Sequence, residues 1–458
     1  MASYFEQFIA ALWNRFRTRA RGARHEGQGL DIGFRVVDDE ITKRHITLSD
    51  TRRATHIALL GKTGSGKTSL LRRFAQQDID EDRPFAFFDI HGTETPFLLG
   101  TINARERRER RHLSDRLVLI DPGDEVVSVG LNPLEMENPD FVRILEFAEI
   151  LQNRFALNQF GARSEELLRN ALYVLAANKL TLIELAPLLT NSGFRAACMK
   201  HVDHAEVRGY FEERYDQVSE AMRAVMREPI LNKASAFTSI PAFRHVLGQA
   251  KSTFSIREAM DTGYWAIVNL AKGRLGPQAL TLGNLIMTSF KQAIFARKNR
   301  SLFSIYADEF QNLISFGSDI ETMLSESRKF GIVIVTANQF LDQYPADTRA
   351  AILSLGSHVY FQLSAADAAN VAQILDGGKS LAERLKNLPP RHCMVKSGSD
   401  RFVEARVPTV IAPKVDYTDL VNRTRYTRGR VRAHIERDIA ARQARFAKIT
   451  KENLDDWE

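Results

Sequence analysis

Residues 56–68 read HIALLGKTGSGKT, a short apolar run that leads into a glycine-rich segment ending in lysine and threonine. The segment Gly61-Lys62-Thr63-Gly64-Ser65-Gly66-Lys67-Thr68 fits the pattern GxxxxGK[ST] at every defined position. In such a loop the glycines let successive backbone N–H groups turn towards phosphate oxygens, while the lysine reaches the β- and γ-phosphates. We therefore predict that these residues bind ATP, that Lys67 also acts in catalysis, and that the Thr68 hydroxyl binds Mg²⁺.

Apolar runs of strand length recur along the rest of the chain. They are nearly continuous and are bounded by Gly, Pro or Asp, which is typical of buried strands in a parallel sheet. Segments with helical spacing lie between them, in the βαβ order of a doubly wound domain. We predict an α/β fold of the P-loop NTPase type, RecA-like, with a mostly parallel sheet and strands at 56–60, 85–90, 116–121, 264–270, 302–308, 331–337 and 358–363.

The connection between the predicted strands near residues 120 and 265 departs from this order. It contains well over a hundred residues with almost no strand signal, and its apolar residues follow helical spacing. A structureless loop of that length is implausible in a compact domain. We expect an N-terminal amphipathic helix and lead-in at 1–50, an ATPase domain at 51–134 and 256–415, an all-helical insertion domain at 135–255, and a basic helical tail at 416–458.

Residues 302–309, LFSIYADE, form a second apolar run, and this one ends in two acids. Beside a P-loop this is the Walker B arrangement, in which Asp308 holds Mg²⁺ and Glu309 polarises the attacking water as a general base. An acidic pair that faces solvent at a strand end is the alternative. A base that activates water favours hydrolysis over transfer to a small molecule. The next predicted strand leads into Asn338 and Gln339, amides that can orient water, sense the γ-phosphate or cap a helix.

The composition of the 458-residue chain is that of a globular protein, with 44% hydrophobic and 26% charged residues. Its two cysteines, Cys198 and Cys393, have no CxxC spacing, which indicates a reducing compartment and no structural zinc. The formal net charge of +7 is compatible with nucleic acid or an anionic membrane as a partner. No apolar stretch is long enough to span a bilayer, and the N-terminus lacks a signal-peptide pattern.

Both ends of the chain carry arginine-rich segments with helical apolar spacing. From Phe5 to Phe16 the apolar residues form one stripe, and arginines follow. This helix either packs on the protein or a neighbouring subunit, or makes a peripheral membrane contact. From about residue 422 arginines are dense, and they either contact DNA phosphates or another subunit, or form a solvated face.

The motifs occur in the order GKTGSGKT, FFDIHG, LIDPGD, GLNPL, NLAKGRLG, YADEF, SESRKFGIVIVTANQ and SHVYFQLSAADAANVAQIL. From about residue 54 to 410 this series resembles the FtsK–HerA class of DNA-pumping P-loop ATPases, and more closely the type IV secretion coupling ATPases of conjugation and their soluble relatives. The resemblance implies that Gln339 contacts nucleotide and that Arg328 acts across a subunit boundary as an arginine finger. It also implies ATP and Mg²⁺ as cofactors, single- or double-stranded DNA as a partner, and a ring, hexameric in that family, with the helical insertion at its cytoplasmic entrance.

Two features depart from the pattern of that family. Its coupling proteins usually begin with transmembrane helices, which this sequence lacks, and this weakens the case for direct docking on a secretion channel. The second-strand motif often carries a lysine or a second acid, whereas this chain has Asp89-Ile90-His91-Gly92. His91 either approaches the γ-phosphate or makes a structural hydrogen bond, and we favour the structural role.

The leading hypothesis is an ATP-driven DNA translocase, a coupling ATPase of conjugative DNA transfer. It would work as a ring oligomer in the cytoplasm or at the periphery of the inner membrane, with a relaxase or a secretion-channel component as its partner. An alternative is a HerA-like motor that acts with a separate nuclease in DNA-end processing or defence. A third hypothesis is a scaffold that binds ATP and recruits another protein without translocation, although a pure switch does not need the water-activating Glu309.

Overall fold

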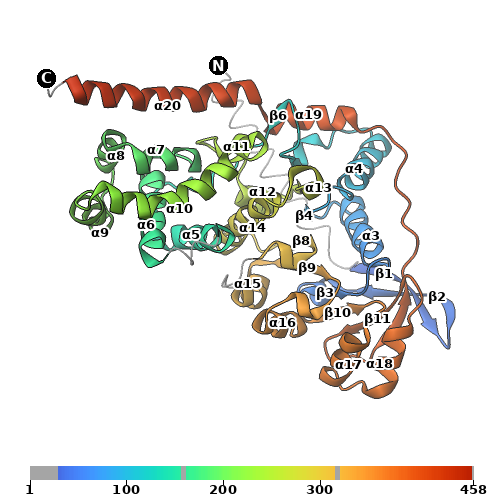
Figure 1. Ribbon diagram of the computed structural model, residues 1–458. Coiled ribbons are helices and arrows are strands. Elements are labelled where there is room, and N and C mark those ends of the chain that lie inside the picture. Colours follow the sequence, from blue (N-terminus) through green and yellow to red (C-terminus); the bar gives the residue numbers. More distant parts are fainter. Residues whose placement is uncertain (1–28, 156–160, 315–319, 456–458) are drawn as a thin grey trace.

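The computed structural model describes residues 29–155, 161–314 and 320–455, and it contains one large sheet with helices on both faces (Figure 1). Within these residues eleven strands form the sheet, in the order β2-β1-β12-β11-β10-β3-β9-β8-β4-β7-β5. The strand that precedes the P-loop, β3, lies in the middle of this order. The strands are Leu30–Val37 (β1), Glu40–Leu48 (β2), Ile57–Leu60 (β3), Phe85–Asp89 (β4), Leu117–Ile120 (β5), Trp265–Asn269 (β7), Phe303–Asp308 (β8), Ile332–Asn338 (β9), Ser357–Tyr360 (β10), His392–Ser397 (β11) and Val403–Arg406 (β12).

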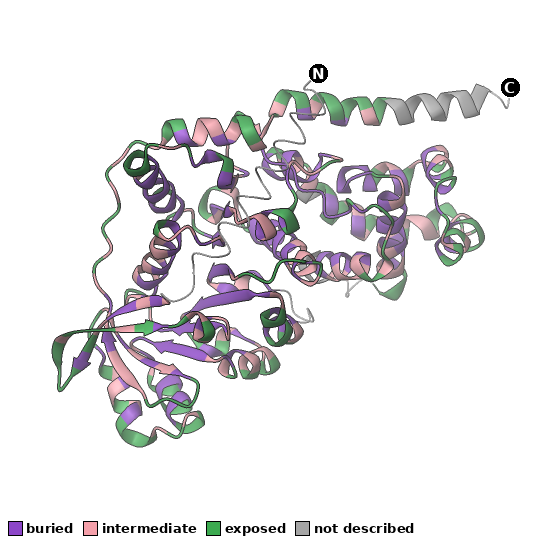
Figure 2. Ribbon diagram, turned by 180° about the vertical axis from the view of Figure 1, so that it is seen from behind, coloured by how far each residue is buried: buried purple, intermediate pink, exposed green. Residues whose placement is uncertain are grey.

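The strands from β10 to β5 all pair in parallel, which confirms the predicted mostly parallel α/β sheet. Successive residues of β4 face opposite sides of this sheet. Phe85 and Phe87 pack with the helices α3 (Lys67–Asp80) and α4 (Thr95–Glu109), and Phe88 packs with α14 (Ala279–Phe295). Because both faces are covered, these strands are mostly apolar, and almost all of their residues are buried (Figure 2).

The antiparallel part of the sheet is not predicted by the sequence analysis. β11 pairs antiparallel with β10, and β12, β1 and β2 extend the sheet in the same manner to its edge. The edge strand β2 is mostly exposed and carries charged residues along its length. Its apolar pattern is therefore weak, and residues 30–48, which we expected only to lead into the ATPase domain, form a hairpin instead.

Between the short strand β6 (Val127–Ser128) and β7, every regular element in the described residues is helical. The division of the chain into domains at residues 134 and 255 remains a prediction. The main helices are α5 (Phe141–Phe155), α6 (Ala162–Ala177), α7 (Leu185–Thr190), α8 (Ser192–Met199), α9 (Ala205–Gly209), α10 (Glu220–Thr238), α11 (Pro241–Leu247) and α12 (Ile256–Thr262).

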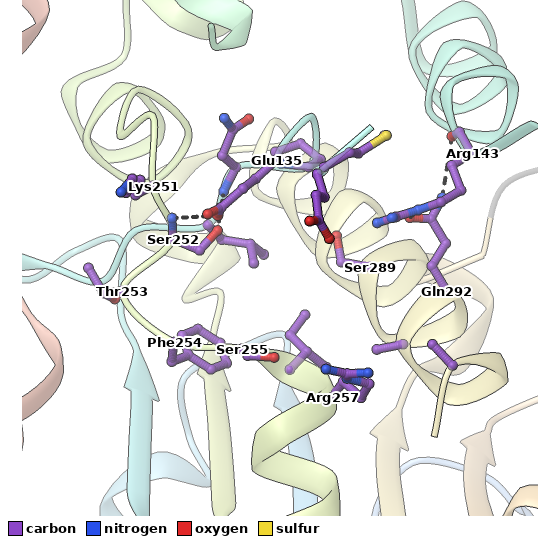
Figure 3. A pocket seen from close by; sticks show the side chains of 18 of the residues that line it. Glu135, Arg143, Lys251, Ser252, Thr253, Phe254, Ser255, Arg257, Ser289 and Gln292 are labelled. Carbon is purple, nitrogen blue, oxygen red and sulfur yellow. Dashed lines mark hydrogen bonds between the residues drawn. The ribbon is translucent and has the colours of Figure 1, made fainter. Parts of the chain in front are cut away.

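The chain enters and leaves this helical region at one place, which we call the crossing (residues 129–135 and 249–255). The two segments bond directly to each other, since Thr253 N donates to Gly130 O at 3.0 Å and Asn132 N donates to Ser252 Oγ at 3.0 Å. A cavity of about 1030 Å³ lies beside the crossing, and Figure 3 shows Ser252 with Glu135 on its wall. The helical region is thus attached to the sheet by two adjoining segments.

Two C-terminal helices run from the sheet to the helical region (Figure 1). α19 (Thr418–Arg428) packs near α4, and α20 (Arg432–Asp455) lies along α8 and α11. Between them β13 (Arg430–Val431) pairs with β6. The described arginines of this predicted basic tail mostly pair within the chain: Arg423 with Glu106, Arg425 with Asp124, Arg430 with Asp438 and Arg442 with Glu184.

The predicted N-terminal amphipathic helix lies outside the described residues. Among the residues that the structure does describe, no helix combines the length and the apolar character needed to span a bilayer.

Candidate nucleotide-binding site

The P-loop, Gly61–Thr68, connects the carboxyl end of β3 to the start of α3, as predicted. Two of its glycines have left-handed backbone, with φ of +76° at Gly64 and +124° at Gly66. A Cβ atom on Gly66 would lie 3.0 Å from both Arg391 Cα and Phe361 Cε1. Glycine is therefore required at position 66 by both the conformation and the packing.

The loop is anchored by backbone bonds to neighbouring parts of the sheet. Gly61 N donates to Asn338 O at the end of β9, and Lys62 N donates to Gln362 O just after β10. Arg391 N, which precedes β11, donates to Ser65 O at 2.7 Å. These backbone bonds fix the loop against β9 and against the segments that follow β10 and precede β11.

Lys67 is buried beneath the loop, at 6% exposure. Its Nζ atom donates to Gly61 O and, at 3.1 Å, to Lys62 O. Burial lowers the pKa of the ammonium, and the carboxylates of Asp308 and Glu309 oppose that shift. The Lys67 ammonium is therefore held by loop carbonyls beside two acids, within the bend of the P-loop.

Asp308 ends β8, and Glu309 follows it with a left-handed φ of +52°. A non-glycine residue adopts this conformation rarely, and here it turns the chain so that Glu309 N donates to Asp308 Oδ1 at 3.0 Å. Burial, and then repulsion from Glu309, raise the pKa of Asp308 to about 6, while Lys67 opposes the shift. The two predicted Walker B acids thus lie close together near Lys67.

Gln339 bridges the P-loop and this acidic pair. Thr63 Oγ1 donates to Gln339 Oε1 at 3.0 Å, and Gln339 Nε2 donates to Glu309 Oε1 at 2.8 Å. A second amide, Gln311, donates to the other oxygen of Glu309 and accepts from Asn338 Nδ2. Sequence analysis missed Gln311, although an amide two residues after a Walker B acid is a signal that could have identified it.

The second-strand motif is organised around Asp89. Its carboxylate accepts bonds from Gly92 N, Glu94 N and Thr95 N at 2.8, 2.9 and 2.7 Å, and so shapes the turn into α4. His91 is exposed.

Sequence analysis missed Glu94, which is 3% exposed. Its carboxylate accepts hydrogen bonds of 2.6 and 2.9 Å from the Arg72 guanidinium. Its charge contributes to the raised pKa of Asp308. Glu94 therefore places a further carboxylate near the Walker B acids.

Arg328 lies apart from the other predicted site residues. It is exposed on the helical turn Ser327–Phe330, directly before β9, and lines a cavity of about 820 Å³. The P-loop follows the carboxyl end of β3, which pairs in parallel with β9. Arg328 is therefore at the opposite end of the sheet from the P-loop of its own chain.

Comparison with known proteins places the chain in a family. A model described as helicase HerA, central domain, matches residues 47–289. No curated protein matches the chain. The solved structure of the plasmid coupling protein TrwB with a non-hydrolysable GTP analogue is similar, with 16% identity, a TM-score of 0.58, and coverage of 87% of this chain and 93% of that chain.

TrwB in complex with ADP and Mg²⁺ gives the same values. VirB4 of Thermoanaerobacter pseudethanolicus has 12% identity, a TM-score of 0.56, and coverage of 84% of this chain and 98% of that one. These likenesses show a shared P-loop ATPase fold. Because the family model spans more than half of the sequence, the chain belongs to the HerA central-domain family of P-loop ATPases, within the FtsK–HerA superfamily.

Proposed function

We propose that this protein hydrolyses ATP at the P-loop and uses the energy to move DNA through a ring of its own subunits. The observation that carries the proposal is the position of Gln339, whose amide contacts both Thr63 in the P-loop and the Glu309 carboxylate. A residue so placed can respond to phosphate in the loop and orient the group that activates water.

The residues of the site fit Mg²⁺. Asp308 is a half-buried carboxyl beside Glu309, and a bound divalent cation would offset the repulsion between the two carboxylates. Thr68, at the start of α3, offers a hydroxyl, so Asp308 and Thr68 would hold the ion. When bound, Mg²⁺ neutralises charge on the β- and γ-phosphate oxygens.

The side chains of the chain supply the remaining chemistry. Lys67 exchanges its bonds to the loop carbonyls for bonds to phosphate oxygens. Glu309 accepts a proton from water as the water attacks the γ-phosphate, and Gln339 holds the carboxylate in the orientation for this step. The two amides on Glu309 keep the base in a fixed direction before nucleotide binds.

The location of Arg328 supports a ring. An exposed arginine at the far end of the sheet cannot stabilise the phosphate of its own subunit, but it can reach nucleotide bound to the next subunit. Hydrolysis would then depend on the relative position of two subunits, which is the coupling that a motor requires. The net charge of +7 favours a polyanionic track such as DNA.

For the biological task we propose conjugative DNA transfer, with a relaxase or secretion-channel component as the partner. The support is the likeness in fold to a plasmid coupling protein and to VirB4. A second candidate is a HerA-like motor acting with a separate nuclease, which the family match favours.

The test is steady-state ATP hydrolysis by the full chain, alone and with single- or double-stranded DNA, beside Glu309→Gln as the inactive control. Stimulation of several-fold by one form of DNA supports the motor and identifies its track. Hydrolysis that ignores both forms contradicts the motor and favours the scaffold. Stimulation that requires linear DNA and is absent with closed circles favours end processing over conjugative transfer.

A further inference from the structure

His56 lies directly before β3, so the four residues of this strand separate it from the P-loop. Its side chain is 2% exposed and its backbone φ is +67°. Outside glycine this conformation is uncommon, although asparagine, aspartate and histidine adopt it more often than other residues. A buried imidazole needs polar partners, because an unpaired polar group in the interior costs free energy.

Both ring nitrogens of His56 have polar neighbours. Nδ1 accepts a hydrogen bond of 3.0 Å from Ile334 N in β9, and Nε2 lies 3.5 Å from Ser327 Oγ. The backbone of Leu324 also bonds the ring. Burial lowers the pKa of His56 to about 4, Leu324 opposes the shift, and the charge of Arg328 adds to it. The neutral ring therefore connects β3 and β9 to the segment 324–328.

That segment carries Arg328. Within the described residues Arg328 has no ion-pair partner, and it faces the cavity of about 820 Å³ that His56 also lines. The cavity lies at the amino end of β3, and the P-loop lies at the carboxyl end. The short strand β3 thus has the P-loop at its carboxyl end, and at its amino end it has His56, which contacts the segment that carries Arg328.

We propose that His56 is a positioning residue that couples the P-loop of one subunit to the arginine which that subunit presents to the next. β3 is hydrogen-bonded on both sides, to β9 and to β10, so it moves as a unit with the loop that phosphate binding reshapes. His56 transmits this shift to Ser327 and hence to Arg328. The inference rests on the proposed function, because Arg328 acts in hydrolysis only when a neighbouring nucleotide is within its reach.

Two substitutions separate positioning from simple support of the fold. Asparagine tolerates positive φ, and its Oδ1 can replace Nδ1 as the acceptor for Ile334 N, but it does not reach Ser327. Glutamine retains a donor near the position of Nε2, but it is strained at positive φ. We therefore expect His56→Asn to be more stable than His56→Gln, and His56→Gln to have the higher kcat.

The matched control is His358→Asn. His358 is 4% exposed in β10, beside β3, and its Nε2 bonds Leu355 O at 2.8 Å rather than the segment 324–328. The test measures the dissociation constant of a fluorescent ATP analogue, kcat and KM for the full-length variants. Thermal unfolding checks that each variant is folded. We expect His56→Asn to bind the analogue as the wild type does and to lose about tenfold in kcat, while His358→Asn keeps its kcat.

A double variant identifies the path. If His56 acts through Arg328, then His56→Asn combined with Arg328→Ala should turn over no more slowly than Arg328→Ala alone. Three results would overturn the role of His56 while leaving the motor intact. They are a kcat of the double variant reduced by the product of the two single losses, a wild-type kcat in His56→Asn, and kcat values that follow the order of stability. A wild-type kcat in Arg328→Ala would instead show that Arg328 does not act in trans, and the proposed role of His56 would fail with it.

Discussion

At the scale of single residues, the hydrogen bonds to the two carboxylate oxygens of Glu309 define the candidate site. Amides from Gln339 and Gln311 bond one oxygen each, so the carboxylate is held in one orientation beside Asp308 and Lys67. The same Gln339 contacts Thr63, and it is therefore the direct side-chain link between the P-loop and the proposed base. Two substitutions test these assignments.

The substitution Glu309→Gln should remove the base and keep the volume of the side chain. We expect ATP to bind and kcat to fall by about 100-fold or more, because a positioned base contributes that much to proton transfer. Filter binding and a single-turnover assay with labelled ATP measure the two quantities. Loss of ATP binding in this variant would show that Glu309 is structural.

The substitution Gln339→Ala should break the link while leaving both of its ends in place. We expect kcat to fall by about tenfold or more with little change in ATP affinity, because the base loses its fixed orientation. Gln292→Ala is the matched control, since Gln292 is a half-buried amide that bonds Arg143 and Glu146 in the helical region. Equal losses in the two variants would mean that the effect is on folding.

At the scale of elements, the parallel strands could be predicted because most of them are apolar on both faces and lead into a polar motif. The hairpin of β1 and β2 could not, because an exposed edge strand has no continuous apolar run. Glu94 and His56 were missed for a different reason. Their partners are distant in sequence or depend on a turn, as with Ile334, which bonds His56 across the sheet.

Two buried histidines at the amino ends of neighbouring strands make stability dependent on pH. Burial lowers the pKa of His56 and of His358 to about 4, whereas in the unfolded chain each has its ordinary value near 6.5. Between these values the unfolded state binds more protons, so the free energy of unfolding falls as the pH falls from about 6.5 to 4. At pH 5 each histidine should lower the free energy of unfolding by about 2 kcal/mol relative to pH 7.

Urea unfolding of the wild type and of the double variant His56→Asn, His358→Asn at pH 7 and pH 5 measures this effect. The comparison is needed because Asp308, with its raised pKa, contributes with the opposite sign. The variant should lose less stability on acidification than the wild type. Equal losses would show that the two histidines are protonated in the folded state.

At the scale of the whole molecule, the sheet separates two halves of a proposed composite site. The P-loop, Asp308 and Glu309 lie at the carboxyl ends of the parallel strands, and Arg328 lies at the amino end. A head-to-tail arrangement of subunits would bring these two ends together, and such contacts close into rings. Within one chain the two halves cannot complete each other.

Mixing two inactive variants tests this arrangement. Arg328→Ala subunits retain the P-loop, and Lys67→Ala subunits retain the arginine, so interfaces formed between the two kinds contain both groups in one orientation. We expect each variant alone to lose hydrolysis and the mixture to regain part of it, measured across mixing ratios. No recovery at any ratio, in oligomers shown by tagged pull-down to contain both variants, would contradict an arginine that acts in trans.

The crossing at Gly130 and Thr253 has a consequence for how this chain can vary. Because those two backbones are already hydrogen-bonded neighbours, everything between them is a closed loop whose ends are fixed by the sheet rather than by its own length. The entropy of closing such a loop grows only slowly with the number of residues in it. Helices can therefore be gained or lost there without changing the register of β5 or β7. The helical region also contacts α14 and α20, so length differences among relatives should concentrate in those of its helices that lie away from these two.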